Sequence, residues 1–143
     1  MDVTFSVSSS LPAPAADIRR KVFMEEQGFK EEFDATDDAA THIVAYSDGV
    51  AAGTCRVFGE GDDLHIGRIA VLPAFRGTGL GSKILREAER VARARGARTV
   101  TLLAQTAARA FYEKNGYVAA SERTLYDEGV PHIVMERSLV RGK

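Results

Sequence analysis

Residues 76–82 combine one arginine with three glycines in a pattern suited to binding phosphate. They follow an apolar segment, 66–71, and precede an amphipathic one. Glycine lets the backbone approach a ligand without a Cβ in the way. The first turn of the following helix offers unpaired N–H groups and a partial positive charge, and Arg76 adds a planar fork of donors. The run is therefore predicted to hold a phosphate-bearing cofactor.

Two familiar phosphate motifs do not fit this run. A P-loop ends in Gly-Lys-Ser/Thr, whereas Gly81, Ser82 and Lys83 carry the last two residues in the reverse order. The dinucleotide fingerprint is Gly-x-Gly-x-x-Gly, whereas Gly77, Gly79 and Gly81 are spaced Gly-x-Gly-x-Gly. The spacing therefore argues against a P-loop nucleotide site and against a Rossmann dinucleotide site.

The composition is that of one ordinary globular domain. Of 143 residues, 45% are hydrophobic and 27% are charged, so we expect a single domain over residues 1–143. The net charge of −1 argues against a nucleic-acid partner bound through phosphate neutralisation. No apolar stretch approaches about 20 residues and no signal peptide is visible, so we expect a cytoplasmic protein that does not act at a membrane.

Metal-binding residue types are few and scattered. Cys55 is the only cysteine, which excludes an intramolecular disulfide and a thiolate metal site. The three histidines, His42, His65 and His132, lack ligand spacing. We therefore expect no metal cofactor.

Hydrophobic periodicity and turn residues predict alternating strands and helices. Asp48 and Gly49 signal a tight turn between two strands, and residues 126–131 form a turn-rich link. The predicted strands cover 3–7, 41–46, 50–58, 64–71, 99–104, 117–121 and 132–139, and the predicted helices cover 15–26, 82–95 and 107–114. This order gives a mixed α/β sheet with a strand–helix–strand crossover through 64–104, which should place ligands at the carboxyl ends of its strands.

The glycine-rich run, as Arg-x-x-Gly-x-Gly, resembles the acetyl-CoA pyrophosphate loop of the GNAT N-acetyltransferase family. The element order is similar to the GNAT fold over essentially the whole chain: a mostly antiparallel sheet with a central parallel pair, flanked by helices. The segment 69–73 before the loop looks like the family's bulged strand. The resemblance implies that the backbones of Ile69, Ala70 and Val71 pair with the pantetheine amides of acetyl-CoA. It also implies that the pyrophosphate is surrounded by Arg76, Gly77, Thr78, Gly79, Leu80, Gly81 and Ser82.

A second match lies at 105–117 and resembles the family element Asn-x-x-Ala-x-x-Phe-Tyr-x-Lys-x-Gly-Phe. The resemblance implies that Gln105, Ala108 and Phe111 contact the cofactor, although Gln105 stands where many members have Asn. Tyr112 takes the position of the family's usual general acid. A third match, at 18–28 and 127–135, resembles the small bacterial ElaA-type branch of the family.

Acetyl transfer to an amine requires an acid for the leaving thiolate and a base for the amine. Tyr112 is the predicted acid. The base stays open between His132, Glu26 and a chain of water molecules. A backbone N–H exposed where the crossover strands separate, after Val71, is predicted to polarise the thioester carbonyl. Cys55 lies in the middle of a strand, where a buried thiol is usually inert.

The acceptor is expected to be a small-molecule or peptide amine. Residues 25–38 carry seven acidic side chains against one basic side chain, Lys30. Such a stretch could steer a polyamine, an aminosugar or a lysine-like amine to the site, or it could be a solvated loop. The resemblance also allows a homodimer.

Three alternative functions stay open at the level of sequence. Acyl-homoserine lactone synthases share the fold and an Arg-x-x-Val-Phe start, which residues 19–23 also show. A non-catalytic acyl-CoA sensor would keep the loop and leave the acid and base idle. An unrelated nucleotide-binding protein would favour ATP over coenzyme A.

Overall fold

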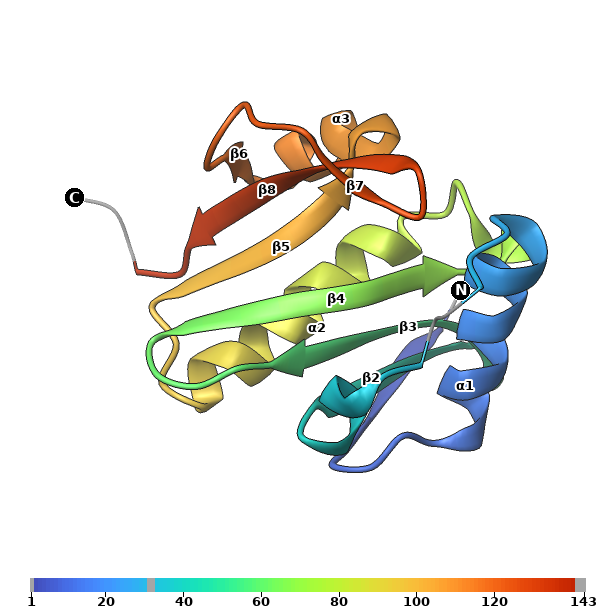
Figure 1. Ribbon diagram of the computed structural model, residues 1–143. Helices are drawn as coiled ribbons and strands as arrows, with labels where there is room; N and C mark the ends of the chain where they lie inside the picture. The colour runs from blue at the N-terminus through green and yellow to red at the C-terminus, as the bar shows by residue number, and fades with distance from the viewer. Residues whose placement is uncertain (1, 31–32, 141–143) are drawn as a thin grey trace.

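The computed structural model describes residues 2–30 and 33–140, which form an eight-stranded mixed sheet (Figure 1). The strands are β1 (Val3–Ser8), β2 (Thr41–Ser47), β3 (Val50–Phe58), β4 (Asp63–Val71), β5 (Thr99–Gln105), β6 (Val118–Ala119), β7 (Leu125–Asp127) and β8 (Val130–Ser138). The α-helices are α1 (Ala13–Arg19), α2 (Leu80–Ala94) and α3 (Arg109–Lys114). Short helices are the π-helix η1 (Arg20–Glu26) and the 3₁₀ turns η2 (Ala35–Asp38), η3 (Pro73–Phe75) and η4 (Thr106–Ala108).

The sheet order confirms the predicted fold class. Neighbouring strands run β1-β2-β3-β4-β5-β8-β6, and β7 pairs with β8 outside this path. Only β4 and β5 pair in parallel, and α2 connects them, whereas every other described pair is antiparallel. The central parallel pair flanked by antiparallel strands is the arrangement expected from the sequence.

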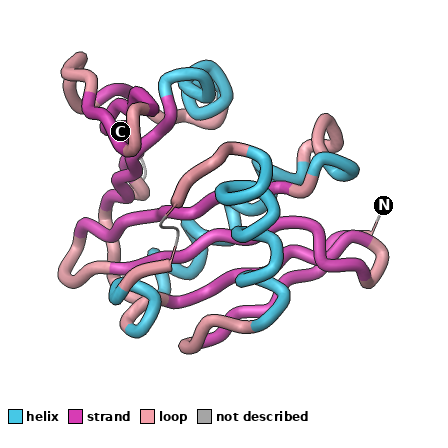
Figure 2. The backbone as a smooth tube through the Cα atoms, turned by 45° about the vertical axis from the view of Figure 1, so that its right-hand side comes forward, coloured by secondary structure: helices cyan, strands magenta, loops and turns pink. Residues whose placement is uncertain are grey.

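Different helices cover the two faces of the sheet. Residues of α1 and η1, such as Ile18 and Val22, pack with Val44 of β2 on one face. Ile43 and Ala45, on either side of Val44, belong instead to the core cluster that α2 covers, because successive strand residues point to opposite faces. Figure 2 shows the α1–η1 segment crossing in front of the strands. None of the described helices is long and apolar enough to span a bilayer.

Three predicted elements differ from the structure. The helix expected over 15–26 is α-helical only to Arg19 and continues as the π-helix η1. The link expected over 126–131 is a tight hairpin between β7 and β8, and its turn residues Glu128 and Gly129 both have positive φ (48° and 82°). Two consecutive positive φ angles are typical of the two-residue turns that join antiparallel strands. The strand expected over 117–121 is shortened to β6.

A bulge in β4 determines where the parallel pair opens. Arg68 has a φ of +51°, and the β3–β4 register shifts opposite it, between Thr54 and Arg56. Pairing of β4 with β5 ends at Ile66 and Leu102, and Figure 1 shows the two strands diverging toward their carboxyl ends. The expectation that the strands separate after Val71 is therefore wrong. β4 stops pairing with β5 after Ile66, just before the bulge at Arg68.

Candidate active site

A cavity of about 190 Å³ lies where β4 and β5 separate. Its walls come from these two strands, from η1 and the segment after it, and from α3, β7 and β8. The lining residues are Phe23, Gln27, Phe29, Ile66, Gly67, Arg68, Ile69, Leu102, Leu103, Gln105, Ala108, Tyr112, Asp127 and His132. Five of the predicted site residues therefore share one cavity: Ile69, Gln105, Ala108, Tyr112 and His132.

Tyr112 is almost enclosed at the wall of this cavity. Its residue exposure is 9%, and its ring packs edge-on against Phe111 and Tyr117, with ring centroids 5.1 and 6.0 Å away. Burial, with a smaller contribution from nearby Cys55, raises the pKa of the Tyr112 phenol above its ordinary value. The hydroxyl therefore stays protonated at neutral pH and can donate a proton into the cavity.

His132 reaches the same cavity from β8, and its position in the sheet is opposite Gln105 of β5. The ring Nδ1 lies 2.8 Å from the Val130 carbonyl oxygen. A carbonyl can only accept, so we assign the proton of the neutral ring to Nδ1, which leaves Nε2 as the acceptor. Nε2 is therefore the ring atom that can take a proton from a neighbouring group.

The two glutamines of the cavity are hydrogen-bonded to each other. Gln105 Nε2 donates to Gln27 Oε1 at 2.9 Å, which ties the end of β5 to the segment after η1. The two side-chain amides therefore join opposite walls of the cavity. Each amide still has a hydrogen-bonding atom that this bond does not use: Oε1 of Gln105 and Nε2 of Gln27.

The glycine-rich loop has the backbone geometry of a cradle. Gly77 and Gly79 have φ angles of +78° and +83°, and only open space surrounds the point where a Cβ would stand on either. The first intrahelical bond of α2 runs from the Lys83 N–H to the Gly79 carbonyl, so the N–H groups of the first turn have no intrahelical acceptor. These groups belong to Leu80, Gly81 and Ser82.

Three residues of the loop contact the rest of the protein rather than facing open space. The Leu80 side chain is buried in the core, so only its backbone can face a ligand. The Thr78 hydroxyl donates to the Phe75 carbonyl at 2.6 Å. A Cβ on Gly81 would lie 3.1 Å from the Phe111 ring, so this glycine lets α3 approach the start of α2.

The remaining residues of the predicted cofactor site lie outside the cavity lining. Ala70 is buried against α1 and η1, and Val71 packs against the other core cluster. A role for these two residues therefore depends on their backbone groups. The Leu72 N–H, the first after Val71, donates to the Ala52 carbonyl at 2.9 Å, so it is engaged within the sheet.

Arg76 and Glu26, predicted for separate roles, form an ion pair with each other. Both terminal nitrogens of Arg76 donate to the two carboxylate oxygens of Glu26 at 2.7 Å, and Arg76 Nε donates to the Val71 carbonyl at 2.9 Å. Hydrogen bonding from Arg76 lowers the pKa of Glu26. Glu26 is outside the cavity lining. The pair joins η1 to the loop, and a phosphate could reach the Arg76 guanidinium only by displacing this carboxylate.

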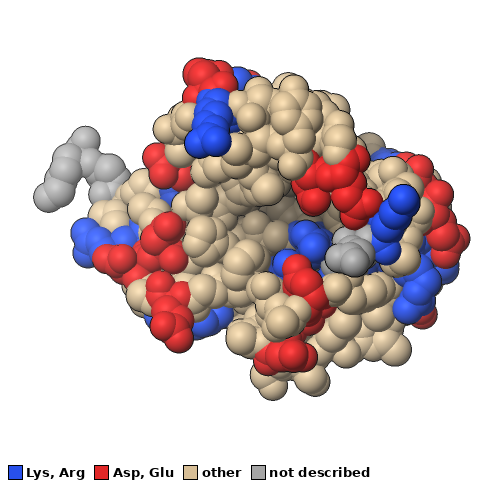
Figure 3. All heavy atoms as spheres, viewed as in Figure 1, with Lys and Arg blue, Asp and Glu red and all other residues tan. Residues whose placement is uncertain are grey.

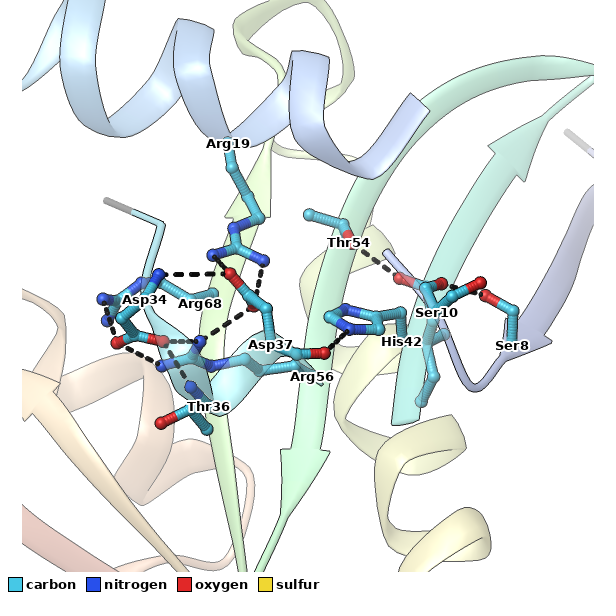
Figure 4. Close-up of polar contacts among 11 residues, drawn as sticks. Ser8, Ser10, Arg19, Asp34, Thr36, Asp37, His42, Thr54, Arg56 and Arg68 are labelled. Atoms are coloured by element: carbon cyan, nitrogen blue, oxygen red, sulfur yellow. Dashed lines mark hydrogen bonds and ion pairs between the residues drawn. The ribbon is translucent and has the colours of Figure 1, made fainter. Parts of the chain in front are cut away.

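A network of charges around η2 was not predicted from the sequence; Arg19, Asp37 and Arg56 are buried in it, whereas Asp34 and Arg68 are partly exposed. Figure 4 shows Asp37 between Arg19 of α1 and Arg56 of β3. Arg19 bonds both Asp37 oxygens at 2.8 and 3.0 Å, and Arg56 bonds one at 2.9 Å. Arg56 also bonds Asp34 at 2.7 Å, and Arg68 bonds Asp34 at 3.3 Å. The network therefore connects α1, η2 and β3 to the bulge of β4.

Burial opposes the charge on Asp37, but the hydrogen bonds from Arg19 and Arg56 outweigh it and hold the pKa of Asp37 at about 2. Hydrogen bonding from Arg56 likewise lowers the pKa of Asp34. Asp34 and Asp37, two of the acidic residues that could have attracted a cationic amine, are therefore paired with arginines instead. Arg56 and Arg68, which are charged residues inside apolar strands, were the signals of this network in the sequence.

Comparison with known proteins covers most of the chain. Residues 14–139 match a family model described as an acetyltransferase (GNAT) domain. The chain belongs to the GNAT family. A Bacillus subtilis (strain 168) relative named as an acetyltransferase is 40% identical over 128 residues, which are 86% of each chain.

Solved structures of GNAT proteins share the fold over nearly the full length. An N-acetyltransferase structure from Lactobacillus plantarum has a TM-score of 0.87 at 30% identity, covering 96% of this chain and 99% of that one. Escherichia coli ElaA has a TM-score of 0.83 at 23% identity, covering 96% and 100%. A GNAT acetyltransferase from Elizabethkingia anophelis with acetyl-CoA bound has a TM-score of 0.74 at 15% identity, covering 96% and 98%. The last two likenesses are of fold alone.

Proposed function

We propose that this GNAT protein is an acetyl-CoA-dependent N-acetyltransferase that transfers acetyl to a primary amine by direct attack. The observation that carries the proposal is the cavity between β4 and β5, whose wall holds a buried tyrosine, kept protonated by its raised pKa, and a histidine whose Nδ1 is hydrogen-bonded to the Val130 carbonyl. An acid and a base at one cavity are what amine acetylation requires.

The residues present fit acetyl-CoA. The unpartnered edge of β4 beyond Ile66 can pair with the amides of an extended pantetheine arm. The positive-φ glycines and the first turn of α2 offer N–H donors and a partial positive charge to a pyrophosphate. The family relative with acetyl-CoA bound has the same fold, which supports this cofactor.

When bound, acetyl-CoA supplies an acetyl group activated as a thioester. In transfer, the amine nitrogen forms a bond to the acetyl carbon as the carbon–sulfur bond breaks. The Tyr112 hydroxyl, which burial keeps protonated at neutral pH, donates a proton to the departing sulfur. His132 accepts the proton that the amine loses, through Nε2.

We favour His132 over Glu26 as the base on geometry and charge. His132 lines the cavity, whereas Glu26 does not and is bonded through both oxygens to Arg76. A carboxylate whose pKa is lowered is also a weaker base. His132→Gln should lower kcat/KM much more than Glu26→Gln does, when both are measured by thiol release.

The proposal is tested by thiol release from acetyl-CoA over a panel of primary amines, with mass detection of the acetylated product. Amine-dependent release supports it. Lactone formation from S-adenosylmethionine instead would identify a lactone synthase. Binding of acetyl-CoA without release for any amine would identify a sensor.

A further inference from the structure

Glu89 of α2 is a buried carboxylate that lies outside the cavity lining. Acidic side chains usually remain in water, as those on the face in Figure 3 do, whereas only 1% of Glu89 is exposed. A buried charge requires partners that bond it and neutralise it. The partners of Glu89 therefore show which elements this carboxylate holds together.

Among the described residues, three side chains bond the Glu89 carboxylate. Arg86, three residues earlier on α2, donates to both carboxylate oxygens at 2.6 and 2.9 Å. Arg137 of β8 donates to Oε1, and the Tyr117 hydroxyl donates to Oε2 at 2.7 Å. Burial and the bond to Glu89 raise the pKa of the Tyr117 phenol, so this hydroxyl is protonated and can donate. Glu89 thus joins α2 to β8 and to the segment that follows α3.

Arg86 extends this cluster to the end of α3. It donates to the backbone and side-chain oxygens of Asn115 at 2.7 and 3.1 Å. Asn115 Nδ2 in turn donates to the Phe111 carbonyl at 2.8 Å. Gly116 leaves room for Arg137, because a Cβ on Gly116 would lie 2.9 Å from Arg137 Nε. The last turn of α3 is therefore fixed against α2.

The helix α3 depends on such contacts because it has only six residues, and isolated helices shorter than about 12 residues are marginal in water. It carries Tyr112, whose ring packs edge-on against the Tyr117 ring with the centroids 6.0 Å apart. Tyr117 is thus held at two points, by Tyr112 at its ring and by Glu89 at its hydroxyl. Since Tyr117 does not line the cavity, it can act on the reaction only through a residue that does.

We infer that Glu89 and Tyr117 are positioning residues for the acid Tyr112. Glu89 holds the Tyr117 hydroxyl, and the Tyr117 ring sets the place of the Tyr112 ring in the cavity wall. This inference rests on the proposed acetyltransferase function. A general acid must lie within hydrogen-bond reach of the atom that it protonates, and a small misplacement of a reacting group costs a large factor in rate. The cluster also ties the acid to α2, which begins at the glycine-rich loop, so the acid and the loop are held in one frame.

A double-mutant cycle in kcat tests this positioning role. Tyr117→Phe keeps the ring beside Tyr112 and removes the bond to Glu89. We expect kcat for amine-dependent thiol release to fall about tenfold, with KM for acetyl-CoA changed by less than about twofold, because the loop is untouched. In a Tyr112→Phe background the same substitution should lower kcat by less than about twofold, since an acid that is absent cannot be misplaced.

Glu89→Gln provides a second variant, because it weakens the hold on Tyr117 from the other side of the bond. It should lower kcat in the same way as Tyr117→Phe, and the two together should lower it little further than either alone. Glu87→Gln is its control on the same helix: Glu87 pairs with Arg90 within α2 and does not line the cavity. This control should keep the kcat of the wild-type protein. If Glu89→Gln does not fold, the cycle of Tyr117 and Tyr112 decides alone.

Tyr117→Phe could instead lower kcat by the same factor with and without the Tyr112 hydroxyl, which would overturn the inference, because a purely structural role is additive. Unchanged kcat in Tyr117→Phe, or in Tyr112→Phe itself, would overturn it too. Thermal unfolding with acetyl-CoA and turnover of the wild-type protein separate these results from the proposed function. If the wild-type protein binds acetyl-CoA and acetylates an amine but the cycle is additive, the inference fails and the acetyltransferase stands; if no amine is acetylated, both fail.

Discussion

Two charged regions meet at the β4 bulge, and they use their charges in opposite ways. In the network around η2, Asp37 and Asp34 are bonded to Arg19, Arg56 and Arg68. In the cavity, the Asp127 carboxylate makes no such pair among the described residues. The comparison separates side chains that hold the backbone in place from side chains that are available to a ligand. Arg68 belongs to both regions, so the network also positions the cavity.

The largest expected effect is the loss of Asp37 from the network. Asp37→Asn removes the carboxylate that Arg19 and Arg56 both bond in a buried setting. Removing one partner of a buried ion pair costs about 3–5 kcal/mol, which should lower the melting temperature by about 10 °C at this chain length.

The matched control is Asp38→Asn, the exposed neighbour in the same acidic stretch. It should change stability by less than about 0.5 kcal/mol. Equal melting temperatures for the two variants would show that the network does not stabilise the fold.

The cavity should show the opposite pattern, with activity lost and stability kept. Tyr112→Phe removes a hydroxyl that we assign as the acid while leaving the ring packed against Phe111 and Tyr117. We expect kcat to fall roughly 100-fold or more, as measured by thiol release.

Tyr126→Phe serves as the control for this change, because Tyr126 is 71% exposed and lies outside the cavity. Its kcat should match that of the wild-type protein. Unchanged turnover in Tyr112→Phe would remove Tyr112 from the mechanism.

Low pH should reduce the stability that the Asp37 carboxylate contributes to the fold. The pKa of Asp37 is about 2 in the folded protein and about 3.9 in the unfolded chain. A lowered folded pKa contributes stability that is present above about pH 4 and is lost as pH falls toward 2. For this side chain, which is 8% exposed, the loss is on the order of 2 kcal/mol.

Urea unfolding at pH 5, 4 and 3 measures this dependence. The wild-type protein should lose more stability over that range than Asp37→Asn, because the variant lacks the titrating carboxylate. Identical slopes in the two proteins would contradict the assignment of Asp37.

The smallest expected effect comes from alanine substitutions at two glycines with the same φ, only one of which lies in the glycine-rich loop. Gly79→Ala forces a Cβ into a residue with a φ of +83° but causes no contact with neighbouring atoms, so it should cost about 1 kcal/mol of stability. Gly61→Ala has the same φ and the same open surroundings in the β3–β4 turn. The two variants should have similar melting temperatures, and only Gly79→Ala should lower the affinity for acetyl-CoA in a binding titration. Equal affinities would place the cofactor elsewhere.

The sequence predicted the framework of the site because its signals are local. The crossover of β4, α2 and β5 follows from hydrophobic periodicity, and the glycines at 77 and 79 have the positive φ that their position requires. The tight turn at Asp48 and Gly49 is confirmed for the same reason, since both residues have positive φ.

What the sequence could not show depends on long-range contacts. Asp34 and Asp37 look like any solvated acids in the stretch 25–38, and only the fold brings Arg19 and Arg56 to them. The opening of the parallel pair depends on a bulge at Arg68; the resemblance implied a bulged strand here and Gly67 precedes the bulge, but neither shows that pairing with β5 ends at Ile66. For the same reason, the sequence did not reveal that Arg68 and Asp127 face one cavity.

Thermal unfolding with acetyl-CoA, with ATP and NAD as controls, tests the central claim most directly. A ligand that binds only the folded state at about 100 times its Kd adds about 2.7 kcal/mol, which should raise the melting temperature by several degrees. We expect this shift with acetyl-CoA and not with ATP or NAD, and a smaller acetyl-CoA shift for Gly79→Ala than for Gly61→Ala. No shift with acetyl-CoA, or a larger one with ATP or NAD, would contradict the assignment of the loop and of the cavity beside it.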